Sequence, residues 1–159
     1  MTSELLRQLQ AVVVRDVVDL AGLEEAYRDP ETGEGIRIPF RLNWTRAQKQ
    51  RRRELQEETL ELQRGYVNLK GLVKDPEAWA AEKERVDQLS DENWRHWMEW
   101  WAGILLLDVG DVMGIAEALP EQHWVWLTHQ VSTRAEEYEK AALKKAQDER
   151  SHISGERDE

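Results

Sequence analysis

The sequence predicts a mainly α protein, a helical bundle of about five to six helices with a small β-hairpin near the N-terminus. Apolar residues recur every three or four positions through most of the chain after residue 45, which is the helical period. Capping residues and prolines interrupt this pattern, so we expect several helices in place of one. One segment before residue 45 alternates apolar and basic residues, which is typical of a half-buried strand.

The chain has 159 residues, with 32 acidic and 22 basic side chains, a net charge of −10 and no cysteine. We expect one domain over residues 1–150, with a helix and hairpin in 1–43, a helical bundle in 44–150 and a disordered tail in 151–159. The charge disfavours general nucleic-acid binding and docking on anionic membranes, and the lack of cysteine excludes thiolate metal sites. No signal-peptide pattern is visible, so a cytoplasmic location is expected, in the host cytoplasm if the protein is viral.

Residues 4–20 allow two interpretations. Leu5, Leu9, Val13 and Leu20 fit a helix that Ser3 caps and Gly22 ends, and this interpretation is favoured. The β-branched residues from Val12 to Val18 leave a strand as the alternative.

The segment from Ile36 to Leu42 alternates apolar and basic residues and predicts a strand, with Pro39 at an edge or at the strand's end. Turn-forming residues precede it in 27–35. We expect residues 23–28 to form the first strand of a small hairpin.

Residues 45–74 predict a long helix. Thr45 and Gln48 have capping-box spacing, and the apolar residues after them are spaced four and three apart. Asp75 and Pro76 predict the cap and first position of the next helix. Ser90 or Asp91 is expected to begin a further, strongly apolar helix.

The remaining chain predicts two more helices. Val112 to Leu119 is expected to be short, after a break near Gly110. Pro120 opens the last helix, and its apolar stripe is expected to consist of Trp124, Leu127, Val131, Ala135 and Tyr138.

Tryptophan is the most unusual feature of the composition, because eight are present against one phenylalanine and three tyrosines. Trp94, Trp97 and Trp101 fit one core-facing stripe, whereas Trp100 and Trp126 lie off the stripes of their helices. Neighbouring helices could cover both, but tryptophan is also enriched among the residues that dominate protein interfaces. We therefore expect Trp100 and Trp126 to contact a protein partner.

A basic run near the start of the long helix belongs to the same expected contact surface. It includes Arg51, Arg52 and Arg53, close to a helix N-terminus, where the helix dipole disfavours cations. The alternative is internal neutralisation by the glutamates that follow, such as Glu57 one turn after Arg53.

Two carboxylate pairs suggest an enzymatic alternative. Glu58 and Glu61 lie three residues apart on one expected helix, and Glu84 and Asp87 lie three apart on the next. On antiparallel helices they could hold Mg²⁺, and the pattern resembles that of all-α nucleoside triphosphate pyrophosphatases. However, 32 of 159 residues are acidic, so such carboxylate pairs also arise by chance. We expect no cofactor.

The order of features from residue 36 to 142 resembles that of the tail assembly chaperones of long-tailed bacteriophages. The resemblance rests on the basic strand 36–42, the capped Arg-rich helix start at 42–48, the segment 107–112, and the Leu119–Pro120 break before a helix with spaced apolar residues.

This resemblance implies a protein without enzymatic activity that binds a long helical tape-measure protein and recruits tail-tube subunits. From the net charge, no nucleic-acid or membrane partner is expected, and self-association into a homo-oligomer stays open. A second alternative, an acidic inhibitor that mimics nucleic acid, rests only on the net charge of −10.

Overall fold

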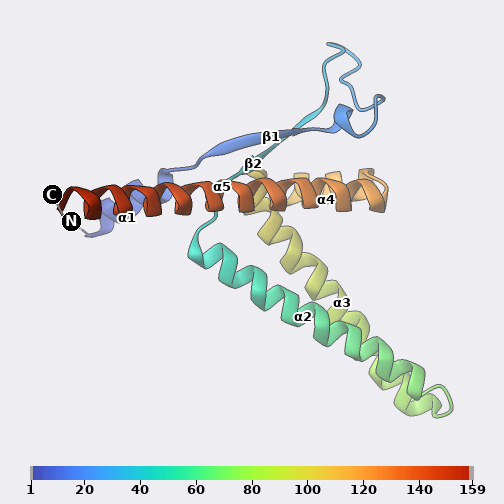
Figure 1. The fold of residues 1–159 in the computed structure, drawn as a ribbon. Helices are drawn as coiled ribbons and strands as arrows, with labels where there is room; N and C mark the ends of the chain where they lie inside the picture. Colours follow the sequence, from blue (N-terminus) through green and yellow to red (C-terminus); the bar gives the residue numbers. More distant parts are fainter. Residues whose placement is uncertain (1, 158–159) are drawn as a thin grey trace. The chain divides into compact units, whose positions relative to one another are not determined.

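A computed structural model describes residues 2–157 of the chain. It contains five α-helices within those residues and a two-stranded antiparallel sheet near the N-terminus (Figure 1). The predicted fold class, mainly α with a small β-hairpin, is confirmed.

The chain divides into two compact units, which are described separately. The first combines the residues up to Trp44 with those from Ile115 onward, and the second is Thr45–Gly114. The chain passes between them after Trp44 and again within α4 (Val109–Ala118). The single domain expected over 1–150 stays a prediction.

The first unit begins with α1 (Thr2–Ala11), which is followed by the antiparallel strands β1 (Arg15–Asp19) and β2 (Arg37–Arg41). Val18 lies opposite Ile38 in the register, and both are buried, as is Phe40. The sheet therefore has one apolar face that belongs to the core.

The first strand differs from the prediction, because it is Arg15–Asp19 and not residues 23–28. The β-branched run is extended, since its backbone is held across the sheet: the Val14 N–H donates to the Asn43 side chain at 2.8 Å. The helix favoured for residues 4–20 therefore ends at Ala11.

Helix α5 (Glu121–Arg157) closes the first unit. Its Leu127, Val131 and Ala135 are buried as predicted, and Arg134 donates a hydrogen bond to the Val17 carbonyl of β1 at 2.7 Å. Beyond Ala135, every side chain described up to Ile153 is exposed. The helix continues through 151–157, where a disordered tail was expected, and residues 158–159 of that tail lie outside the described residues.

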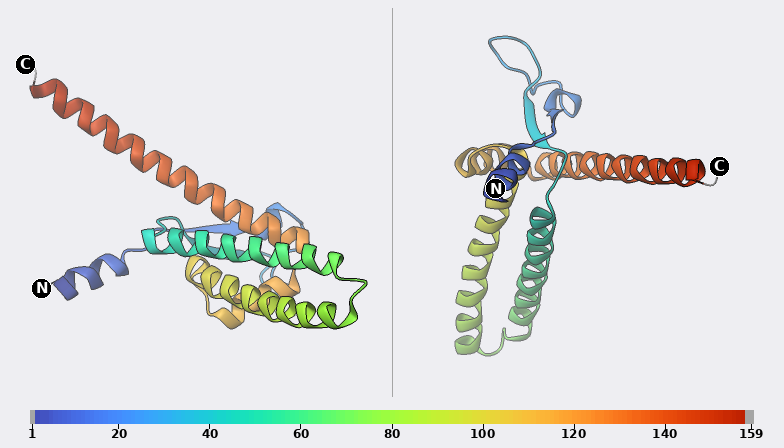
Figure 2. Two further views of the ribbon diagram at one scale, coloured as in Figure 1. Left: turned by 90° about the horizontal axis from the view of Figure 1, so that it is seen from below. Right: turned by 90° about the vertical axis from the view of Figure 1, so that its left-hand side faces the viewer.

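The second unit contains a helical hairpin, in which α2 (Arg46–Gly71) and α3 (Pro76–Leu105) lie side by side and antiparallel (Figure 2). The predicted capping box of Thr45 and Gln48 is confirmed, as are the Asp75 cap and Pro76 in the first turn of α3. The predicted break at Ser90 or Asp91 is wrong, because α3 runs without interruption to Leu105.

Candidate functional site

A polar network inside the α2–α3 hairpin fixes how the two helices meet. Asn93, only 7% exposed, donates from its amide nitrogen to Glu58 and to the Thr59 hydroxyl, both at 3.2 Å. His96 lies 3.0 Å from Glu58, and the Trp97 indole N–H donates to Thr59 at 3.0 Å. Because the buried Asn93 and its part-buried partners satisfy one another, the network favours one register of the hairpin.

Trp100 belongs to this hairpin core. It is 7% exposed, its indole N–H donates to the Gln48 carbonyl at 2.8 Å, and its ring packs edge-on against Trp97 and Trp101. Little of the Trp100 ring is therefore left exposed in this structure, and contact with a partner through Trp100 stays a prediction. The core position that the sequence predicts for Trp94 is wrong, because this side chain is 41% exposed.

The second predicted contact tryptophan, Trp126, is half-buried on α5. Among the residues that the structure describes, its indole N–H has no hydrogen-bond partner, and no buried side-chain nitrogen or oxygen lacks one. The Trp126 N–H is consequently open to solvent, and contact with a partner through Trp126 stays a prediction.

The three predicted arginines have different surroundings. The Arg52 guanidinium lies 5.9 Å from the centroid of the Trp100 ring, a cation–π contact within the hairpin. Arg51 pairs with Glu54 at 3.2 Å. Arg53 is exposed and has only a long contact of 3.5 Å with Gln50, so it is the member of the run most available to a partner.

The four carboxylates of the pyrophosphatase alternative do not converge. Glu58 is engaged by His96 and Asn93, while Asp87 pairs with Lys83 on its own helix at 2.6 Å. Within residues 2–157, no three His, Cys, Asp or Glu side chains gather as a metal site would require. The four-carboxylate Mg²⁺ site is therefore not present in this geometry.

An exposed apolar face lies on α1, whose leucines the sequence predicts only as part of a helix. Leu5, Leu6 and Leu9 are 57%, 54% and 61% exposed, and Val12, just beyond the helix, is 55% exposed. Leu5 and Leu9 are one helical turn apart with Leu6 beside them, so the three share one face. If residues 12–18 are interpreted as a strand, the helix before them must be short. Its leucines then have no neighbouring strand or loop to cover them, so this interpretation was the signal for the exposed face.

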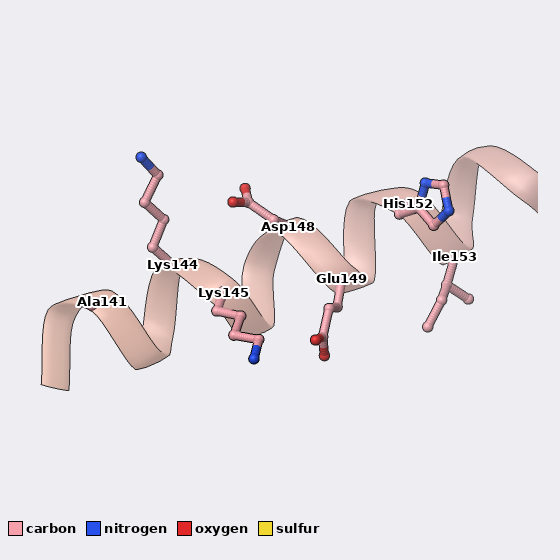
Figure 3. Close-up of a pocket in the computed structure, with 7 residues that line it drawn as sticks. All are labelled: Ala141, Lys144, Lys145, Asp148, Glu149, His152 and Ile153. Atoms are coloured by element: carbon pink, nitrogen blue, oxygen red, sulfur yellow. The ribbon is translucent and has the colours of Figure 1, made fainter. Parts of the chain in front are cut away.

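A surface hollow on α5 does not have the features of a binding site. It is lined by residues of α5 alone, as the close-up in Figure 3 shows, among them Lys145, Glu149 and Ile153. Because one helix cannot enclose a ligand, this hollow is not a small-molecule site.

No family model, curated protein or solved structure matches the chain. Across residues 2–157, no helix combines the length and the apolar character needed to cross a bilayer.

Proposed function

We propose that this chain is a binding protein without enzymatic activity, a tail assembly chaperone of the kind found in long-tailed bacteriophages. In this role it binds the tape-measure protein, a long helical polypeptide, and helps recruit tail-tube subunits. The resemblance of residues 36–142 to that family supports the specific role, and the exposed surface of α1 supports polypeptide binding in general.

The apolar face of α1 is the observation that carries the proposal. Leu5, Leu6 and Leu9 each expose more than half of their side-chain surface, and all described α1 side chains are exposed. Contiguous apolar surface on a small protein marks an interaction site, because leaving it in water is unfavourable. An amphipathic helix of this kind suits the side-by-side packing of helices in helix-groove recognition.

The position of α1 also suits a binding role. The Val12 carbonyl accepts hydrogen bonds from Asn43 at 3.1 Å and from Arg41 at 3.3 Å, so the chain is fixed where it leaves the helix. The C-terminal end of α1 is therefore anchored, while its leucine face stays exposed. Less conformational freedom is then lost when a partner binds.

Co-expression with a long helical tape-measure polypeptide tests the proposal. We expect the wild-type chain to keep this polypeptide soluble and to co-purify with it. The double variant Leu5→Ser, Leu9→Ser should reduce the co-purified amount at least about tenfold, since two buried leucine contacts are lost. Val73→Ser is the matched control, because Val73 is 70% exposed but lies beyond the end of α2.

The results of this experiment test the chaperone role and the α1 contact surface separately. If the wild-type chain neither binds nor solubilises the polypeptide, the chaperone role is wrong. If the double variant binds as well as wild type and the Val73→Ser control, α1 is not the contact surface.

A further inference from the structure

We infer that α2 of one copy of this chain pairs, in parallel, with the C-terminal half of α5 of a second copy. This inference does not depend on the proposed function. It rests on two exposed helix faces whose charges are opposite at the same spacing.

The first face lies on the solvent side of α2. Arg53, Glu57 and Leu60 follow one another at four and three residues, which places them on one side of the helix. Arg53 and Glu57 are exposed, and Leu60 is 53% exposed. Leu55 and Leu62 form the buried side of the same helix. Arg53, Glu57 and Leu60 therefore take no part in the packing of α2 against α3.

The second face lies on α5 beyond its buried stripe. Glu136, Lys140 and Leu143 have the same spacing of four and three residues. The two charged residues are exposed, and Leu143 is 58% exposed. In this half of α5 a long helix is exposed on all sides, and isolated helices are marginally stable in water, so a packed neighbour would stabilise it.

The two faces are complementary only in the parallel direction. When Arg53 is set opposite Glu136, Glu57 falls opposite Lys140, so each position meets the opposite charge. In the antiparallel direction, Arg53 would instead lie opposite Leu143. Among the described residues, none of the four charged side chains forms an ion pair within the chain.

The same parallel alignment sets Leu60 opposite Leu143, so an apolar pair follows the two charge pairs. Charged residues beside an apolar contact are how paired helices select partner and direction. A second copy is the occupant that this pattern specifies, because both faces belong to the same sequence. Two such stripes bury far less than the ~1,200 Å² of a stable interface, so the association should be weak and concentration-dependent.

Disulfide trapping between two chains tests the pairing, because the natural sequence contains no cysteine. Chains carrying Leu60→Cys are mixed with differently tagged chains carrying Leu143→Cys and are oxidised under mild conditions. We expect the mixed disulfide to form at least about tenfold faster than with Ala141→Cys, an exposed position two residues before Leu143 on the opposite side of α5. Equal rates for the two mixtures would overturn the proposal.

Charge exchange provides an independent measurement of the same contact. In sedimentation velocity, Arg53→Glu should weaken self-association about fivefold, and mixing it with Glu136→Arg chains should restore association. Raising the salt to 1 M should weaken wild-type association. A wild-type chain that stays monomeric at every concentration, or an Arg53→Glu chain that associates as strongly as wild type, would overturn the inference.

Discussion

Gly65 lies where α2 and α3 approach each other closely. It is buried, and a Cβ added there would lie 2.8 Å from Cγ2 of Val86, which is itself fully buried. We expect Gly65→Ala to lower the free energy of unfolding by about 1–3 kcal/mol, because the helices must separate to admit the methyl group. Chemical denaturation followed by tryptophan fluorescence measures this change.

Gly71 supplies the matched control, since it lies in the same helix but has no atom within 4 Å of its Cβ position. Gly71→Ala should leave stability unchanged or raise it by less than about 1 kcal/mol through helix propensity. Equal losses for the two variants would contradict the close packing at Gly65.

Glu82 and Arg85 form an ion pair on α3, with Arg85 Nη2 2.6 Å from Glu82 Oε1. The hydrogen bond from Arg85 lowers the pKa of Glu82 below its usual value and raises the pKa of Arg85. A depressed carboxyl pKa means that the pair stabilises the fold above the unfolded pKa of glutamate. This contribution is lost as the pH falls through the folded pKa.

We therefore expect Arg85→Met to raise the pKa of the Glu82 carboxyl toward its usual value. A titration of the side-chain carboxyl followed by NMR measures the shift. An unchanged Glu82 pKa would show that the ion pair does not persist in solution.

The tryptophans show where residue-level prediction from sequence failed. The apolar stripe of α3 was centred on Trp94 and Trp101, which left Trp100 outside. The face that meets α2 instead includes the polar Asn93, because Thr59 and Glu58 satisfy its amide. Hydrophobic periodicity cannot locate a seam that contains hydrogen-bonded polar residues.

At the scale of elements, α2 has two unlike faces that differ in their effect on stability. Leu55 is fully buried, whereas Leu60 is 53% exposed on the same helix. Leu55→Ala should cost about 2–5 kcal/mol through the cavity it leaves, and Leu60→Ala should stay within about 0.5 kcal/mol. Thermal or urea unfolding at low protein concentration measures both, and similar costs would contradict the assignment of the faces.

Local signals predicted some element boundaries well. The capping box at Thr45 and the Asp75–Pro76 start are determined by side chains next to the helix ends, so the sequence alone sufficed. The first strand depends on pairing with residues 18 to 26 positions away, so the β-branched run from Val12 to Val18 allows a strand but does not by itself select Arg15–Asp19 over 23–28. The sequence predicts a helix start at Ser90 or Asp91, whereas α3 continues through both residues.

At the scale of the molecule, the sequence predicted the fold class but not the division into two units. Periodicity determines which segments are helical, whereas the grouping of α5 with the N-terminal sheet depends on long-range contacts such as that of Arg134 with Asp16. The same limit applies to the contact surface. The exposure of the α1 leucines cannot be predicted from local sequence, because it depends on where α1 ends and β1 begins.

Hydrogen exchange along α1 tests polypeptide binding through this helix most directly. The amide exchange of residues 3–11 is compared with and without a long helical tape-measure polypeptide, using the full chain. The account predicts slower exchange in these residues on binding, because the leucine face becomes covered and the helix is stabilised. Unchanged exchange in α1, while the polypeptide is bound elsewhere on the chain, would contradict it.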